Sequence, residues 1–261
     1  GIRDTSVTGV QTCALPISFL CAAAAAAGFF DAIAGGGGLI QLPALLIGLQ
    51  DKSVVNVLGT NKFAAVFGTI NAANRYRKQV KIDKKFLAAM MVPAFLGSMG
   101  GAQLASRVPT EKMRVVVLIA LIVIFIYTVL NPKLGHDDNQ RIDYKIAAIA
   151  GLAIGFYDGI FGPGTGTFLM AVLVGVLGFG FLNASAIAKF TNVATNLAAI
   201  IIFAKHGAIL WGIGIALAIS NVLGSTLGTH LAIKGGSPLV RKVFLLMTGL
   251  LIAKVGYDVI K

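Results

Sequence analysis

Long apolar blocks separated by short polar gaps are the feature that most limits what this 261-residue chain can fold into. The charges sit almost entirely in the gaps, and 57% of the residues are hydrophobic whereas only 12% are charged. A soluble domain carries about a quarter charged residues. Blocks near the roughly 20 residues that cross a bilayer as a helix are typical of a membrane protein. The sequence therefore predicts an all-α, polytopic membrane protein.

The blocks predict membrane-embedded helices in two sets. The most polar stretch, 131–145, separates the sets, and glycine-rich breaks at 35–38 and 162–164 interrupt the first block of each. The piece after the first break holds only about 11 residues, too few to cross a bilayer alone. The expected helices cover 19–34, 39–49, 53–76, 84–106, 113–130, 146–161, 167–181, 184–204, 209–233 and 239–260.

The two sets are copies of one unit. At a constant offset of 127 positions, 28–38 aligns with 155–165 without a gap. The charged residues that match in this register are Asp31 with Asp158, Lys62 with Lys189 and Arg114 with Arg241. Chance similarity between apolar segments would not align these pairs, so we expect a duplication. The expected units are repeat 1 at 19–130, a connecting loop at 131–145 and repeat 2 at 146–261.

The first eighteen residues are treated separately from the repeats. Residues 1–18 lack the basic segment followed by an apolar core that marks a secretory signal. Their sequence looks like translated sequencing-adapter read-through at the end of a contig. We expect this leader to be non-native, and we interpret the fold from Phe19 onward.

The breaks at 35–38 and 162–164 predict a solute site. Glycine and proline inside an apolar segment free backbone N–H and C=O groups, which survive in a membrane only when buried in protein or lining a watery cavity. The helix that starts after each break presents unpaired N–H donors and a partial positive charge, which suit an anion. The alternative is that these glycines only let helices pack closely. Four consecutive glycines, with a second break at the equivalent place, favour the solute site.

Charged residues inside the apolar blocks mark the same region. Asp31 and Asp158 precede the two breaks, and Lys62 and Lys189 lie inside later blocks. Ionisable groups in membrane helices are costly and by default mark a transport pathway. The alternative is a buried Asp–Lys pair that only joins the repeats. We expect coupling or ion-pair roles for Asp31 and Asp158. Asn192 and Asn196 lie one helical turn apart and share a face. The residues expected to bind the solute are Lys62, Lys189, Asn61, Asn192, Asn196, Gly36, Gly37, Gly164 and Thr165.

Other classes of site are not indicated. The formal net charge of +12 comes from basic residues in short loops, which fit cytoplasmic loops and anionic lipids better than nucleic acid. Cys13 and Cys21 show no metal-type spacing. His136, His206 and His230 belong to no catalytic motif. We therefore expect no enzyme, no cofactor and no metal; the expected partners are a small anionic solute and membrane lipids, with a homo-oligomer left open.

The motifs carry a resemblance. GFFDAIAGGGGLIQLPALL followed by GTNK, and GFYDGIFGPGTGTF followed by AKFTNVATN, resemble the sulfite exporter TauE/SafE family of membrane transporters from about Phe19 to the C-terminus. In the second half, Pro163 and Thr165 stand where the first half has glycines. The resemblance implies an inner-membrane permease for sulfite or small organosulfur compounds. Its motifs fall on Gly28, Asp31, Gly35 to Gly38, Asn61, Lys62, Gly155, Asp158, Gly162, Gly164, Lys189 and Asn192.

Three functions remain open from the sequence. The first is a transporter that moves a small anion by alternating access. The second is a cation- or proton-linked carrier that uses Asp31 and Asp158 as primary ligands. The third is an intramembrane enzyme or a scaffold subunit, which the symmetric charged residues disfavour. The loop at 75–85 has six basic residues and its equivalent near Lys205 has one, which favours inverted repeats with Lys261 outside the cytoplasm.

Overall fold

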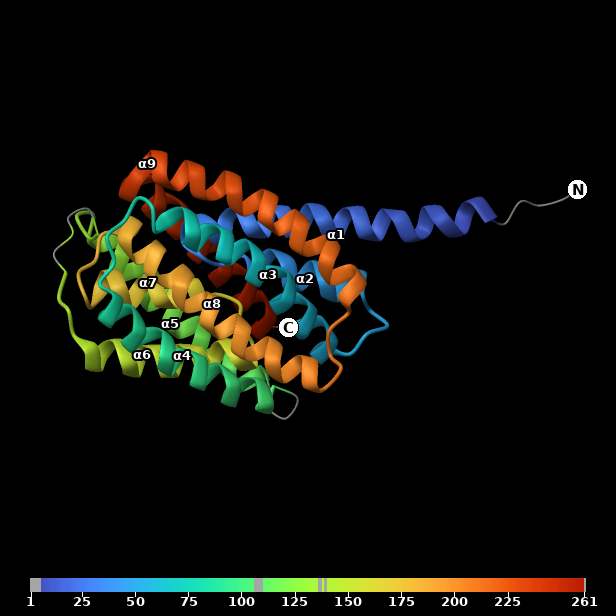
Figure 1. Cartoon of the computed structure of the whole chain (residues 1–261), viewed down its shortest axis with the longest axis horizontal. Coiled ribbons are helices and arrows are strands. Elements are labelled where there is room, and N and C mark those ends of the chain that lie inside the picture. Colours follow the sequence, from blue (N-terminus) through green and yellow to red (C-terminus); the bar gives the residue numbers. More distant parts are fainter. Residues whose placement is uncertain (1–5, 106–109, 136–137, 139, 261) are drawn as a thin grey trace, which may run out of the picture.

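The computed structural model describes residues 6–105, 110–135, 138 and 140–260, and this part of the chain contains helices and no strands. His136 and Lys261, two residues considered above, lie outside the described residues. The helices pack lengthwise into one bundle, from which the first turns of α1 project (Figure 1). Their bounds are α1 Ser6–Ala34, α2 Gly38–Gly48, α3 Val54–Tyr76, α4 Lys84–Leu104, α5 Thr110–Leu130, α6 Tyr144–Ile160, α7 Thr165–Gly175, α8 Phe181–Lys205 and α9 Trp211–Ile260.

The expected helices agree with the observed ones to within a few residues over most of the chain. α9 is continuous in its bounds, but Gly236 inside it has φ 61° and ψ −164°, which no helix contains. Pro238 follows, and proline lacks the N–H that would continue the ladder of helical hydrogen bonds. α9 is therefore two helical segments joined at Gly236, as the separate blocks 209–233 and 239–260 predict.

The 127-residue offset is visible in the helix bounds. Both ends of α7 fall 127 positions after those of α2, and α9 begins 127 positions after α4. Helix packing follows the same correspondence, since α1 packs on α9 and its counterpart α6 packs on α4. Equivalent glycines make these contacts close. A Cβ atom at Gly28 would collide with the backbone of Asn221, and one at Gly155 would collide with the backbone of Ala94.

The two halves run in opposite directions. Ala25 contacts Gly224 and Phe29 contacts Gly228, so α1 and the first segment of α9 are parallel. Figure 1 shows this pair running from right to left, whereas α4 and α6 run from left to right. Across the 127-residue offset, α1 and α6 are thus antiparallel, as are α4 and the first segment of α9, which agrees with the expected inverted arrangement.

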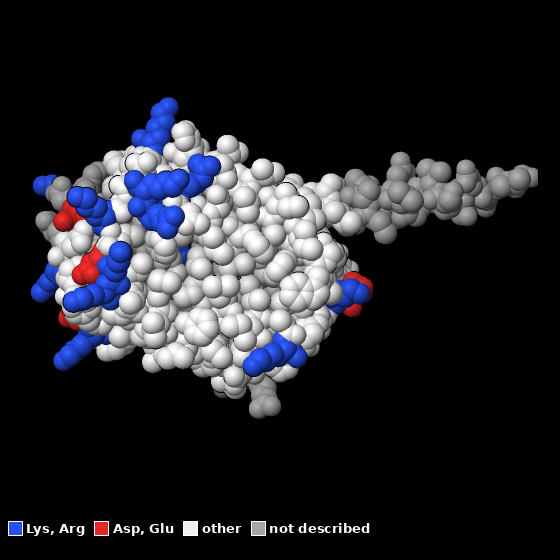
Figure 2. All heavy atoms as spheres, viewed as in Figure 1, with Lys and Arg blue, Asp and Glu red and all other residues white. Residues whose placement is uncertain are grey.

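The surface has the banding of a membrane protein. Lysine and arginine gather at the end of the molecule where α3 ends and α4 begins, a broad belt almost free of charge covers the middle of this face, and a few charged residues lie at the opposite end (Figure 2). Exposed apolar side chains such as Val92, Leu96 and Leu223 face outward. Among the described residues, three helices are long and apolar enough to cross a membrane: Ile17–Ala34, Lys84–Leu104 and Phe181–Lys205. The chain is an integral membrane protein.

The charge distribution predicts the orientation. Basic loops stay in the cytoplasm, so we expect the lysine- and arginine-rich end to be cytoplasmic. The segment of α9 after Gly236 runs from that end back toward the opposite one (Figure 1). A phosphatase fused to the C-terminus should therefore be active, and a fluorescent protein fused there should be dark. An active fluorescent fusion with an inactive phosphatase would contradict this orientation.

Candidate functional site

The two breaks lie against each other in the bundle. Gly35 and Gly162, which are equivalent at the 127-residue offset, have φ values of 81° and 90°, a backbone conformation that favours glycine. A Cβ atom at Gly35 would lie 2.7 Å from the Cα atom of Gly166. Across the same contact, a Cβ atom at Gly38 would lie 3.4 Å from the Cα atom of Pro163. The glycines therefore allow the start of α7 to meet the break before α2.

Both short helices open onto one pocket. α2 starts at Gly38 and α7 at Thr165, and both N-cap residues are glycines, which have no side chain to cap the helix. Several N–H groups at these starts already donate to backbone carbonyls of the breaks, but the aligned peptide dipoles leave about half a positive charge at each helix start. Gly36, Gly37 and Gly38 line the pocket from one break, and Gly164, Thr165 and Gly166 line it from the other.

The first buried ion pair links Lys62 of α3 to Asp158 of α6. The ammonium nitrogen of Lys62 lies 2.6 Å from Oδ1 of Asp158, and the two side chains are only 5% and 4% exposed. The hydroxyl of Thr165 donates to the same carboxylate oxygen at 2.6 Å. Gly162 leaves room for the lysine, since a Cβ atom there would be 3.0 Å from the ammonium nitrogen. This pair is desolvated on all sides.

The second ion pair links Lys189 of α8 to Asp31 of α1 and is built differently. The ammonium nitrogen of Lys189 lies 2.8 Å from Oδ2 of Asp31. The lysine side chain is 0% exposed, but that of Asp31 is 23% exposed. The backbone N–H of Gly37 donates to the other oxygen of Asp31 at 3.4 Å. The equivalent carboxylates therefore differ, because Asp31 is accessible and Asp158 is not.

Both ion pairs cross from one half of the chain to the other. Asp31 of repeat 1 pairs with Lys189 of repeat 2, and Lys62 of repeat 1 pairs with Asp158 of repeat 2. The sequence left open whether these residues pair or bind solute, and the structure brings all four into pairs. Within each pair, the positive charge of the lysine cancels the negative charge of the aspartate. Any electrostatic attraction for an anion in this conformation therefore comes from the helix N-termini and amide donors, unless a lysine leaves its aspartate.

The pocket collects nearly all residues that the sequence marks as a site. It encloses about 50 Å³, enough for a few water molecules or one small oxyanion. Lys189 is the exception, since it lies behind Asp31 and outside the lining. The residues from the sequence that line the pocket are Asp31, Gly36, Gly37, Asn61, Lys62, Asp158, Gly164, Thr165, Asn192 and Asn196.

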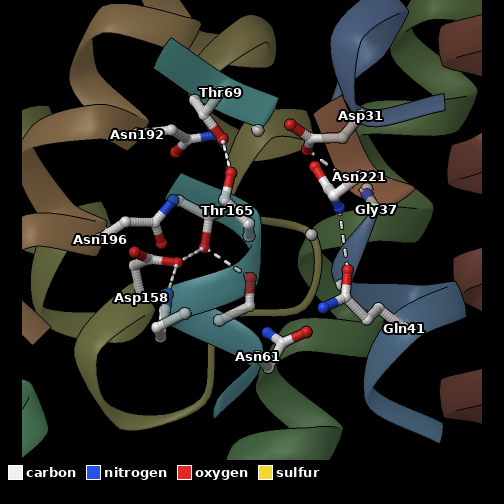
Figure 3. Close-up of a pocket in the computed structure, with 17 residues that line it drawn as sticks. Asp31, Gly37, Gln41, Asn61, Thr69, Asp158, Thr165, Asn192, Asn196 and Asn221 are labelled. Atoms are coloured by element: carbon white, nitrogen blue, oxygen red, sulfur yellow. Dashed lines mark hydrogen bonds and ion pairs between the residues drawn. The ribbon is translucent and has the colours of Figure 1, made fainter. Parts of the chain in front are cut away.

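Polar atoms in this region lack partners. Within the described part of the chain, Oδ1 of Asn61, Oδ1 of Asn192 and Oδ2 of Asp158 are buried without a hydrogen bond. Figure 3 shows Asn192 and Asn196 on one side of Thr165, and Asp31 and Asn221 on the other. Buried polar groups in proteins are nearly always satisfied, and all three of these atoms are acceptors, so a hydrogen-bond donor such as water would fit beside them.

Gln41, Thr69 and Asn221 also line the pocket and were missed by the sequence interpretation. The amide of Asn221 donates to Oε1 of Gln41 at 2.9 Å and to the carbonyl oxygen of Ala24 at 3.2 Å. These bonds join α9 to α2 and α1. Gln41 and Asn221 could have been found from the sequence, because each is an amide residue inside an apolar block. Polar side chains in membrane helices usually face the protein interior.

Comparison with known proteins gives consistent matches. A family model described as Sulfite exporter TauE/SafE matches residues 20–255. The probable membrane transporter protein YfcA of Escherichia coli (strain K12) is 38% identical over 237 residues, covering 89% of this chain and 86% of its own length. The probable membrane transporter protein ORF9 of Sinorhizobium sp is 36% identical, with 89% of each chain covered. No solved structure matches the chain significantly.

Proposed function

We propose that this chain, a membrane transporter that belongs to the sulfite exporter TauE/SafE family, carries a small anion such as sulfite or a small sulfonate across the inner (plasma) membrane. The family and its relatives are transporters rather than enzymes. The observation that carries the proposal is the central pocket at the N-termini of α2 and α7. Two helix starts that meet at one point concentrate N–H donors and positive potential where an anion can bind.

The amides around the pocket supply the remaining contacts. Asn61 comes from α3, Asn192 and Asn196 come from α8, and each carries an NH₂ group that can donate to an oxyanion. Because the charges of lysine and aspartate cancel within each ion pair, the pocket is close to electrically neutral. An incoming anion can then draw Lys62, which lines the pocket, away from Asp158 and form a charge-assisted hydrogen bond.

Alternating access fits the arrangement of the two halves. The pocket lies between antiparallel units, and most of the polar side chains that line it are buried in the described conformation. Inverted units can rock against each other around a fixed central site, which opens it to one side of the membrane at a time. In the proposed cycle, the described conformation is a step in which the site is largely buried and Asp31 is still accessible.

The test removes the lysines without leaving unpaired charge. The paired variant Lys62→Gln/Asp158→Asn should bind sulfite about tenfold more weakly, because one charge-assisted hydrogen bond contributes about 1.5–3 kcal/mol. Its counterpart Lys189→Gln/Asp31→Asn removes a lysine that lies outside the pocket lining and should weaken sulfite binding less. Sulfite affinity is measured from the thermal shift of the purified protein. The surface variant Lys52→Gln serves as the control. Wild-type affinity in both paired variants would mean that the lysines only join the repeats.

Proton coupling through Asp31 is a second candidate role, favoured by one observation. Asp31 lines the pocket and keeps 23% exposure, so water in the pocket reaches its carboxylate. Protonation would release Lys189. In Asp31→Asn, we expect sulfite transport to lose its dependence on a pH gradient while sulfite binding persists. Asp158→Asn is the matched comparison at the inaccessible position. Transport that still follows the pH gradient in both variants would exclude a coupling role.

A further inference from the structure

A second hollow opens at the basic end of the molecule, where the C-terminal end of α3 lies beside the end of the first segment of α9. It is open at the surface, and its volume is about 610 Å³, compared with about 50 Å³ for the central pocket. We call it the basic hollow. Its lining residues are Asn71, Asn74, Arg75, Lys78, Gln79, His230 and Ile233.

The chemistry of the basic hollow suits small anions. Arg75 and Lys78 contribute two positive charges, and the amides of Asn71, Asn74 and Gln79 contribute further hydrogen-bond donors. No carboxylate is among the described residues of its lining. A concave site lined by charge of one sign raises the local concentration of the opposite ion.

Polar side chains of α3 and α9 form a seam that lies between the basic hollow and the central pocket. The amide of Asn71, in the hollow, donates to Oγ of Ser225 at 2.8 Å and to Oγ1 of Thr226 at 2.9 Å. Thr69 and Asn221, from the same two helices, line the central pocket. At 1.5 Å per residue, Thr69 and Asn74 are separated by roughly 8 Å along α3. The two sites are therefore neighbours on one helix pair.

Asn221 closes the seam in the described conformation. Its side chain lies directly against Gly68 of α3, where a Cβ atom would collide with Oδ1 of Asn221. The bonds from its amide to Gln41 and Ala24 hold it there. Position 94, the counterpart of Asn221 in repeat 1, is an alanine, so the equivalent seam has no such amide. Of these two equivalent positions, only Asn221 carries an amide.

We infer that the basic hollow is the entry site on its side of the membrane, where small oxyanions collect before they pass Asn221 into the central pocket. This inference rests on the proposed transport of an anion. Retention of basic loops in the cytoplasm also explains positive charge at this end. That explanation treats all basic residues of the loop alike, whereas an entry site depends on Arg75 and Lys78 in particular.

The experiment compares two double variants that remove equal charge from one loop. Arg75→Gln/Lys78→Gln neutralises the basic hollow, and Lys81→Gln/Lys84→Gln neutralises exposed lysines outside its lining. Asn74→Cys, in a chain with Cys13 and Cys21 replaced by serine, provides a thiol at the basic hollow. The first readout is the rate at which an anionic thiol reagent modifies this cysteine, relative to a cationic one. The second is the KM for radiolabelled sulfite in vesicles of both orientations.

The variant at Arg75 and Lys78 should react about three- to tenfold more slowly with the anionic reagent, and the effect should shrink at high salt. Its KM for sulfite should rise by a similar factor, with an unchanged maximal rate, only in vesicles that expose the basic end to the added sulfite. Equal labelling in the two double variants would overturn the inference, as would an unchanged KM in a protein that transports sulfite. If the variant at Arg75 and Lys78 reacts more slowly with the anionic reagent but the protein moves no sulfite, the hollow still collects anions and the proposed substrate is refuted.

Discussion

Replacing Lys62 with methionine should destabilise the folded protein by about 3–5 kcal/mol, because it leaves the carboxylate of Asp158 buried and unpaired. The carboxylate is 4% exposed and, among the residues that the structure describes, would keep only the hydroxyl of Thr165, 2.6 Å away, as a partner. Oδ2 of Asp158 already lacks a hydrogen bond within the described part of the chain. Thermal unfolding of the purified protein in detergent, followed by intrinsic fluorescence, measures the loss.

Two further variants isolate the buried charge as the cause. Adding Asp158→Asn to Lys62→Met removes the unpaired charge, so most of the lost stability should return. Lys52→Met breaks the exposed pair between Lys52 and Asp51, whose side chains are 42% and 72% exposed. Water screens such surface pairs, so the midpoint of thermal unfolding should not change measurably. If Lys62→Met unfolds no earlier than Lys52→Met, the buried pair does not stabilise the fold.

The positions of the breaks and of most helices could be predicted from the sequence because they depend on local chemistry. Glycine runs at 35–38 and the Gly-Pro-Gly turn at 162–164 interrupt any helix, and polar gaps end the apolar blocks. The constant offset then identified the equivalent residues in the two halves. Of the site residues named from the sequence, Lys189 alone lies outside the pocket lining.

The partners of the charged residues depend on tertiary packing and could not be predicted. The offset makes Asp31 equivalent to Asp158 and Lys62 equivalent to Lys189, but it does not say whether pairs form within a repeat or between repeats. The answer depends on how α3 and α8 cross the two breaks, which brings each lysine to the aspartate of the other half. The different exposure of Asp31 and Asp158 also depends on tertiary packing. A threonine at 165 donates to Asp158, whereas the equivalent Gly38 has no side chain to approach Asp31.

Gly35→Ala should abolish transport and lower thermal stability, because position 35 combines two constraints. Its φ of 81° strains any residue with a Cβ atom. The added Cβ would also lie 2.7 Å from the Cα atom of Gly166 and 2.9 Å from the backbone nitrogen of Thr167, atoms that cannot rotate away. Relief requires the two breaks to separate, which moves the N-terminus of α7 away from the pocket.

Two alanine variants separate these constraints. Gly207→Ala tests the backbone strain without a collision, since Gly207 has φ 63° and no atom lies within 4 Å of an added Cβ. This variant should lower the free energy of unfolding by about 1–2 kcal/mol and retain transport. Gly212→Ala lies within α9 with nothing within 4 Å, so it should be neutral or slightly stabilising. The measurements are the unfolding midpoint and the initial rate of sulfite uptake into vesicles. Contact between the breaks matters for transport only if Gly35→Ala loses uptake that Gly207→Ala retains. Equal uptake in these two variants would show that the bundle tolerates separation of the breaks.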